Sequence, residues 1–280
     1  MMVGDAMVDE AVLCRQVAIE TAAAGRASRM VVLIGRVLAL VLLLGSWAWL
    51  SGRVLDASFF SDPTTVLRTM WHMVGTAPFL ANLKVTMTEL LAGYAIGAVG
   101  GLLLATAVGT IGLLQRVVHP FLLAFYSIPK IALAPLFIMW FGLGMLPKVV
   151  LAAVFVFFVV FMNTLEGLRT VNAGLVSVAR VMGASPRQLL TTISLPTVVP
   201  FVLTAMRIAV PEAMIGAVIG EFIAASAGLG HAVLAASNQF NTPVVLAGVI
   251  ILLLVVLALD GVVAAVERRL LRWRALETTR

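Results

Sequence analysis

Charged residues are scarce in this sequence: Asp, Glu, Lys and Arg make up 11% of its 280 residues, whereas hydrophobic residues make up 62%. A water-soluble domain carries about a quarter charged residues, so this composition is typical of a chain that crosses a membrane several times. The single cysteine, Cys14, excludes an internal disulfide. A nucleic-acid-binding surface explains the net charge of +6 poorly, because arginines directly follow the last apolar run.

Signatures of catalysis and of nucleotide binding are missing as well. None of the three lysines, Lys84, Lys130 and Lys148, closes a phosphate-binding loop of the form Gly-x-x-x-x-Gly-Lys-Ser/Thr. No Gly-x-Ser-x-Gly elbow is present. The three histidines are far apart in the sequence, which argues against a metal site or a catalytic pair. We therefore expect no enzyme active site and no cofactor on this chain, and any driving energy has to come from a partner.

Long apolar runs predict six membrane-spanning helices, with no internal repeat and no second domain. The runs cover residues 30–50, 83–110, 117–141, 149–168, 198–222 and 244–266. The first run spans about 31 Å as a helix and is interpreted as a retained anchor, with a cleaved signal peptide as the alternative. The expected organisation is a cytoplasmic tail over 1–29, a transmembrane domain over 30–270 with a hairpin at 172–196, and a cytoplasmic tail over 271–280.

Two of these runs contain residues that predict how the helices pack. Gly93, Gly97 and Gly101 are spaced four apart in the second run, which lets another helix backbone approach closely. Pro129 and Pro135 interrupt the third run, and each half is too short to cross a bilayer alone. We therefore expect one kinked crossing whose freed backbone groups face the bundle or a cavity.

The distribution of arginine orients the spans. Six crossings place both termini and the hairpin on the same side, and twelve arginines gather there, against Arg53, Arg68 and Lys148 on the other side. The twelve are Arg15, Arg26, Arg29, Arg116, Arg169, Arg180, Arg187, Arg268, Arg269, Arg272, Arg274 and Arg280. Because basic residues are enriched on the cytoplasmic side of a membrane protein, we expect both termini to be cytoplasmic.

The most explicit local chemistry lies between the fourth and fifth runs. Asn172 is suited to cap one helix, and Gly183 stands where the end of that helix favours a positive φ. A second helix begins with Ser185-Pro186-Arg187-Gln188, a capping box with proline at the first position, and Pro196 is expected to end it. The pattern predicts a two-helix hairpin with one face for the bundle and one for a soluble partner. Its apolar face is expected to comprise Leu175, Val178, Ala179, Met182, Leu189 and Ile193.

This hairpin resembles a motif of permease subunits of ABC importers, Glu-Ala-Ala-(three residues)-Gly-(nine residues)-Ile-x-Leu-Pro. Ser177 replaces the glutamate and Val178 the first alanine of that motif. The matching residues are Ala179, Gly183, Ile193, Leu195 and Pro196. Residues 127–142 and the pattern Gly220-Glu221-(six residues)-Gly228-Leu-Gly230 resemble the nitrate/sulfonate/taurine branch of this family. The resemblance covers roughly residues 60–270.

The resemblance implies an all-α membrane protein with six transmembrane helices of the MetI-like permease type and a cytoplasmic coupling hairpin. It implies a homodimer in the bacterial inner membrane, embedded in lipid, with no nucleic-acid partner. The partners would be a cytoplasmic ABC ATPase subunit, which binds ATP and magnesium, and an external solute-binding protein. The residues expected to couple to the ATPase are Ser177, Ala179, Arg180, Gly183, Ala184, Ser185, Arg187, Ile193, Leu195 and Pro196.

Ionisable residues within the apolar runs are the candidates for a solute path, because each is costly in a bilayer. Lys130, Arg207 and Glu212 count to the middle of their runs, and Glu221 lies nearer the outside. Two interpretations stay open: an ion pair joining one of the cations to Glu212 or Glu221, or a polar lining that attracts the solute. The excess of positive charge favours a small anion of the sulfonate, taurine or nitrate class. An uncharged pyrimidine- or flavin-type precursor is the alternative, because similar proteins also carry such solutes.

Two other classes of function are weighed against an importer permease. A proton-coupled secondary transporter would use Glu212 or Glu221 as its proton carrier, but it has no need of an exposed docking hairpin. An intramembrane enzyme would need a nucleophile with a neighbouring base, and the sequence offers no such constellation. The permease subunit of an importer is therefore the favoured interpretation.

Overall fold

The computed structural model describes residues 30–51, 53 and 60–271. The arginines expected in the two terminal tails, at 15, 26, 29, 272, 274 and 280, lie outside the described residues. The chain separates into two compact units, residues 1–65 and 66–280, and each is described by itself. The first unit contains a helix, Met30–Leu50, which coincides with the first predicted span.

The first unit ends at the start of helix α2 (Pro63–Met73). The carboxylate of Asp62 accepts a hydrogen bond from the Thr64 hydroxyl and another, 3.0 Å long, from the backbone N–H of Thr65. These bonds hold the pKa of Asp62 well below its usual range, so that the helix start keeps an ionised cap at neutral pH.

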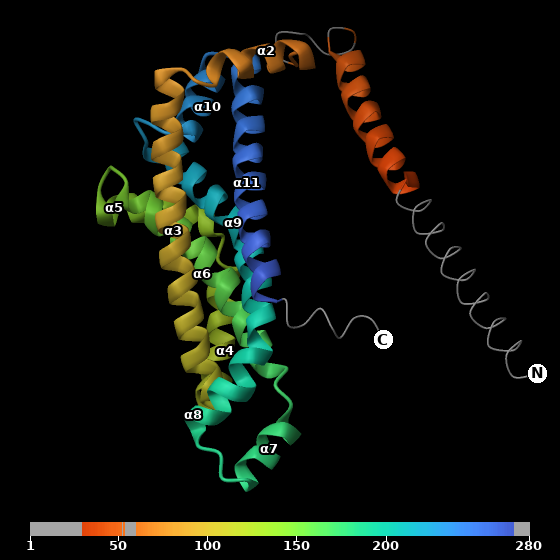
Figure 1. Ribbon diagram of the computed structural model, residues 1–280. Helices are drawn as coiled ribbons and strands as arrows, with labels where there is room; N and C mark the ends of the chain where they lie inside the picture. Colours follow the sequence, from red (N-terminus) through yellow and green to blue (C-terminus); the bar gives the residue numbers. More distant parts are fainter. Residues whose placement is uncertain (1–29, 52, 54–59, 272–280) are drawn as a thin grey trace, which may run out of the picture. The chain divides into compact units, whose positions relative to one another are not determined.

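The second unit is almost entirely helical, and Figure 1 shows the hairpin helices α7 and α8 at the end of the bundle opposite α10. After α2 the elements are α3 (Ala77–Thr110), α4 (Gly112–Ser127), a short 3-10 helix η1 (Lys130–Leu133), α5 (Ala134–Phe141), α6 (Leu146–Arg169), α7 (Ala173–Val181), α8 (Pro186–Gln188), a π-helical segment η2 (Leu189–Ser194), α9 (Leu195–Ala224), α10 (Leu229–Asn238) and α11 (Thr242–Leu270).

Within the described ranges, five helices are long and apolar enough to cross a membrane, and a bent pair of helices makes a sixth if it counts as one span. All six lie at the predicted apolar runs. The five are Met30–Leu50, Ala77–Thr110, Leu146–Arg169, Pro186–Ala224 and Thr242–Leu270, and the bent pair is Pro120–Ser127 with Lys130–Phe141.

The bent pair turns by 79° where the sequence predicts a kink. The break lies between α4 and η1, at Ile128 and Pro129, which both have extended backbone torsions. Pro135 does not break the chain a second time. It lies in the first turn of α5, a position that tolerates proline because that turn has no partner for a backbone N–H.

The predicted glycine contact is confirmed, and its partner is α6. A Cβ atom added at Gly97 would lie 2.8 Å from the Cβ of Val156 and 3.0 Å from the backbone nitrogen of Phe157, and closer still to the Ala153 carbonyl. Gly93 and Gly101 face α6 in the same way. Only glycine lets the α3 and α6 backbones approach this closely.

Helix α6 lies at the centre of the second unit. Helix α6 has more buried residues than any other described helix, and 61% of its most apolar 18-residue stretch is buried, compared with 6% for α11. The helices that cover α6 do so with small side chains, since Ala205, Ala209, Ala213 and Ala217 of α9 are all fully buried. Such packing is expected where lipid, as apolar as leucine, supplies no hydrophobic drive between helices.

One prediction about a helix end is wrong. Pro196 does not end the second hairpin helix, because α8, η2 and α9 form one continuous helix over Pro186–Ala224. The wider turn of η2 precedes Pro196, which stands in the first turn of α9 and removes one backbone donor without redirecting the chain.

The close contact of α3 and α6 predicts opposite effects for two neighbouring glycines of α3. Gly97→Ala should lower the free energy of unfolding in detergent by about 1–3 kcal/mol, because the new methyl group overlaps the α6 backbone. Gly100→Ala should be neutral or stabilising by up to about 1 kcal/mol, since its methyl group would meet only Phe157 at 3.6 Å. Thermal unfolding of the two purified variants checks this, and equal stabilities would contradict the assigned contact.

Candidate functional site

The first hairpin helix is defined by hydrogen bonds at both of its ends. The side chain of Asn172 accepts bonds from the backbone N–H groups of Gly174 (2.8 Å) and Leu175 (3.4 Å), as predicted for an N-cap. At the other end Gly183 has a φ of +86°. Its N–H donates to the Arg180 carbonyl (2.9 Å), and the next N–H, that of Ala184, donates to Ala179 (3.0 Å). This pair of bonds is a Schellman motif, which favours glycine at the left-handed position.

The second hairpin helix begins with the predicted capping box. The backbone N–H of Gln188 donates to the Ser185 hydroxyl (3.3 Å), and the Ser185 N–H donates to the Gln188 side-chain oxygen (2.8 Å). Pro186 occupies the first turn, where its missing N–H costs nothing. The hairpin therefore has a fixed turn, and helix α9 continues directly from it.

The predicted apolar face of the hairpin is largely uncovered in the structure. Helix α7 has no buried residue. Leu175 and Val178 are each 59% exposed, and Val181 and Met182 at its end are 90% and 81% exposed. Of the predicted face only Leu189 is buried. A rigid turn that exposes large apolar side chains is the property of a docking surface.

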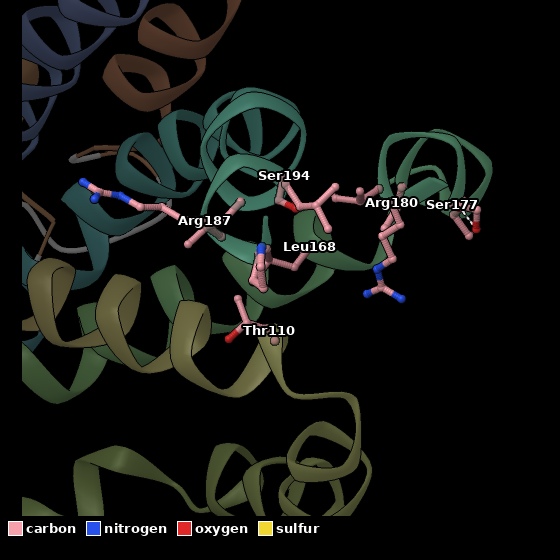
Figure 2. Close-up of a pocket in the computed structure, with 13 residues that line it drawn as sticks. Thr110, Leu168, Ser177, Arg180, Arg187 and Ser194 are labelled. Carbon is pink, nitrogen blue, oxygen red and sulfur yellow. Dashed lines mark hydrogen bonds between the residues drawn. The ribbon is translucent and has the colours of Figure 1, made fainter. Parts of the chain in front are cut away.

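Two of the hollows beside this surface contain most of the residues predicted to couple to the ATPase. Figure 2 shows the larger, of about 670 Å³, between the hairpin and the ends of α3 and α6. Ser177, Arg180 and Arg187 line it, and the two arginines extend to different sides in that view. The smaller hollow, of about 330 Å³, is lined by residues that include Ala179, Gly183, Ala184 and Ile193.

Three of the predicted coupling residues have simple surroundings. Ser177, which stands in place of the motif glutamate, is exposed and donates from its hydroxyl to the Ala173 carbonyl (2.9 Å). Its hydroxyl forms no hydrogen bond with Arg180 or Arg187 of the kind that a glutamate carboxylate could form. Leu195 and Pro196 are exposed on the first turn of α9. These residues are therefore available to a partner rather than used within the hairpin.

The charges within the apolar helices do not pair as predicted. Arg207 on α9 bonds Asp260 on α11 through two hydrogen bonds of 3.1 Å, and Glu267 through a third of 3.3 Å. Of the two expected partners, Glu221 accepts hydrogen bonds from Thr86 and Gly230 instead, and Glu212 has no ion pair or hydrogen bond among the described residues. Arg207 was assigned to the middle of its span from the α9 sequence alone. Its contact with the last turns of α11 places it nearer the hairpin end of the bundle.

Lys130 lies at the break between α4 and α5, and its ammonium group faces aromatic rings. The Nζ atom is 4.5 Å from the centroid of the Tyr126 ring, 5.5 Å from that of Phe155 and 5.8 Å from that of Phe158. Cation–π contacts of this kind stabilise an ammonium ion only partly. In the part of the chain that the structure describes, Lys130 forms no ion pair, so no carboxylate neutralises it.

A buried charged cluster joins α3, α6 and α9, and the sequence did not predict it. Lys148, which was counted among the outer loop charges, is buried and forms an ion pair with Glu89 of α3. Glu221 of α9 is also fully buried and accepts hydrogen bonds from the Thr86 hydroxyl (2.6 Å) and the Gly230 N–H (2.5 Å). The pattern Gly220-Glu221-(six residues)-Gly228-Leu-Gly230 was the only sequence signal for this arrangement.

No metal site is formed by the described residues: they contain no group of three or more His, Cys, Asp or Glu side chains that could hold an ion. The candidate site therefore consists of the exposed hairpin, the lysine at the helix break and the buried cluster. None of these elements carries out bond chemistry by itself.

Comparisons with known proteins agree with this architecture. The family described as binding-protein-dependent transport system inner membrane component matches residues 97–272. The formylaminopyrimidine transport permease protein ThiX of Halalkalibacterium halodurans is 37% identical over 70% of this chain and 78% of its own length. The taurine transport system permease protein TauC of Escherichia coli is 29% identical over 83% of this chain and 86% of its own length.

A solved structure shares the fold. A chain in the structure of inward facing conformations of the MetNI methionine ABC transporter has a TM-score of 0.54 and 22% sequence identity, covering 74% of this chain and 96% of that chain. The predicted MetI-like class of all-α membrane fold is thus confirmed. Members of the matched family are membrane components that do not hydrolyse ATP. A separate subunit hydrolyses it. The chain belongs to the family of inner membrane components of binding-protein-dependent transport systems, and it is a permease subunit of an ABC importer.

Proposed function

We propose that two copies of this chain form the transmembrane part of an importer for a small anion, with both termini and both hairpins in the cytoplasm. Each hairpin docks onto one of two ATPase subunits, which bind ATP and magnesium. A soluble binding protein delivers the solute to the opposite end of the bundle. Closure of the ATPase dimer brings the two hairpins together and opens the bundle to the outside.

The observation that carries this proposal is the exposed apolar face of a rigid hairpin. Caps at Asn172 and Ser185 and a positive φ at Gly183 hold the turn without help from the bundle. Val181 and Met182 then remain almost fully exposed. A soluble domain that covers these side chains would remove them from water, which is the dominant favourable contribution to protein association.

The continuity of the hairpin with α9 suggests how force reaches the solute path. The helix over Pro186–Ala224 has 39 residues and is about 58 Å long. Its first turn carries the hairpin residue Arg187, and its last turn carries Glu221 of the buried cluster. A displacement of the hairpin by the ATPase is therefore passed along one helix to the far end of the bundle.

The cytoplasmic placement of the hairpin rests on the distribution of arginine. Lys148 no longer counts as an outer loop charge, because it is buried against Glu89. The outer side then retains Arg53 and Arg68, against the twelve arginines on the hairpin side. This asymmetry supports cytoplasmic termini more strongly than the sequence count did.

Lys130 supports an anionic solute. Arg207 is neutralised by two carboxylates, so of the two midspan cations inferred from the sequence only Lys130 has no carboxylate partner among the described residues. Its position at a broken helix, a usual place for a cavity lining, suits a solute path. Arg207, Glu212 and Glu221 remain candidates for the lining, although Glu221 is enclosed by protein in this conformation. An uncharged pyrimidine- or flavin-type solute is the alternative.

Strain at the hairpin turn predicts a loss of docking. Gly183→Val should cost about 1–3 kcal/mol, because a β-branched residue does not tolerate a φ of +86°. The turn should then relax and tilt α7, so that the affinity for the ATPase subunit falls by about tenfold or more. Co-purification of the ATPase with the tagged permease from membranes measures this. Gly183→Asn should retain most binding, since asparagine tolerates the left-handed region.

A matched control separates docking from general strain. Gly75 has a φ of +93° and free space around it, but it lies between α2 and α3, away from the hairpin. Gly75→Val should therefore leave ATPase binding unchanged at equal expression. Normal binding by Gly183→Val, or equal loss in both variants, would show that the hairpin is not the docking element.

Removal of the unpaired cation predicts a loss of transport. In vesicles that contain the binding protein and the ATPase, Lys130→Met should lower the uptake of a sulfonate by about tenfold. This is the factor expected from the loss of one charge-assisted contact. Lys84→Met removes an exposed lysine of α3 and should leave uptake unchanged. Unchanged uptake in Lys130→Met would make Lys130 structural, and a neutral native solute would refute the anion assignment.

A further inference from the structure

Three charged side chains are buried together at the end of the bundle near α10, away from the hairpin. Glu89 and Glu221 have no exposed surface, and Lys148 is 5% exposed. They come from α3, α9 and α6, so that no two of them share a helix. Burying ionised groups costs several kcal/mol each unless partners compensate, which makes their balance of charge important.

The carboxyl group of Glu221 is held by a complete set of donors. Thr86 donates to one of its oxygens and the Gly230 N–H to the other. The Thr86 hydroxyl in turn accepts a bond from the Leu229 N–H (2.8 Å). A Cβ atom added at Gly230 would lie 2.7 Å from a Glu221 oxygen. The loop residue Gly228 and the first turn of α10 therefore close tightly around this carboxyl group.

The carboxyl group of Glu89 has a different environment. Its only partner of opposite charge is Lys148, and neither of its oxygens accepts a hydrogen bond from a described donor of ordinary geometry. Glu221 lies beside it: Thr86, which donates to Glu221, stands one turn before Glu89 on α3, and Lys148 packs against Gly220, the residue next to Glu221. Two carboxyl oxygens repel each other when both groups are ionised, but they form a strong hydrogen bond when one of the groups carries a proton.

Charge counting shows that the cluster lacks one positive charge. Two ionised carboxylates and one ammonium group sum to −1. Other charged or titratable side chains do not supply the difference within the described residues. Lys84 of α3, with Arg68 and His72 of α2, is exposed. On α11, Asp260 and Glu267 are bound to Arg207. His231 of α10 is half-buried beside Gly230 and Glu212 of α9 is half-buried, and neither forms an ion pair.

We propose that this cluster is a proton-binding site in which Glu89 and Glu221 share one proton beside the Lys148 ammonium group. The proton forms an O–H bond on one carboxyl group and donates to an oxygen of the other, which makes the cluster neutral. When α3, α6 and the loop before α10 separate, water reaches both carboxyl groups and takes up the proton. Each opening of this end of the bundle then releases one proton, and each closure binds one.

The sign of the pH dependence follows from this equilibrium. The proton is bound only in the closed arrangement, so lowering the pH favours closure and raising the pH favours opening. The proton acts as a ligand of one conformation. The proton does not drive the transport cycle. Under the proposed function, the ATPase subunit supplies the energy for that cycle.

Infrared spectroscopy of the purified permease in lipid tests the site directly. A protonated carboxyl group has a C=O stretching band that ionised carboxylates lack. The wild-type protein at neutral pH should show this band. Glu89→Gln leaves Lys148 and Glu221 as a neutral pair, so it should lack the band. Glu212→Gln, which alters a carboxyl group elsewhere on α9, should retain it. This readout is independent of ATPase docking.

Each result decides the proposal. Absence of the band from the wild-type protein overturns it without any variant, as does a band of unchanged intensity in Glu89→Gln. Glu89→Asp keeps the carboxyl group and should shift the band rather than remove it. A poorly folded glutamine variant therefore still leaves the assignment testable, because an unshifted band in Glu89→Asp excludes Glu89 as the carrier.

Discussion

The hydrocarbon core of a bilayer offers no hydrogen-bond partner, so each polar group inside it has to be satisfied by the protein itself. This constraint accounts for the main features of the second unit. Helix α9 stays helical through Pro200 and Pro211 instead of breaking. The described backbone departs from helix at Pro129, where an ammonium group and aromatic rings surround the break. Glu221 is enclosed by donors from α3 and from the first turn of α10.

The same constraint separates the rigid parts of the molecule from its docking parts. Helices α3, α6 and α9 pack through glycine and alanine at distances that leave no freedom for larger side chains. The hairpin is instead held by its own caps, and of its predicted apolar face only Leu189 is buried. Because α9 begins in the hairpin and ends in the buried cluster, one rigid helix connects the proposed ATPase surface with the opposite end of the bundle.

Local features of this fold could be predicted from the sequence, and long-range pairings could not. The caps at Asn172 and Ser185 and the positive φ of Gly183 depend on residues within one or two turns, so their signatures are readable in the chain. The partners of Arg207 and Lys148 depend on which helices meet and at which height. A lysine two residues after the start of a helix therefore looked like a loop charge. Pro196 was misjudged because the π-helical turn before it has no sequence signature of its own.

The central claim is that the exposed hairpin contacts the ATPase subunit, and site-directed cross-linking tests it most directly. Cys14 is first replaced, so that each variant has a single cysteine. Met182 lies on the hairpin, and Trp71 lies on α2, away from the hairpin. Both side chains are 81% exposed. In membranes that contain the whole importer, Met182→Cys should cross-link to the ATPase subunit and Trp71→Cys should not. Cross-linking of the ATPase at Trp71, or none at Met182, would contradict the account.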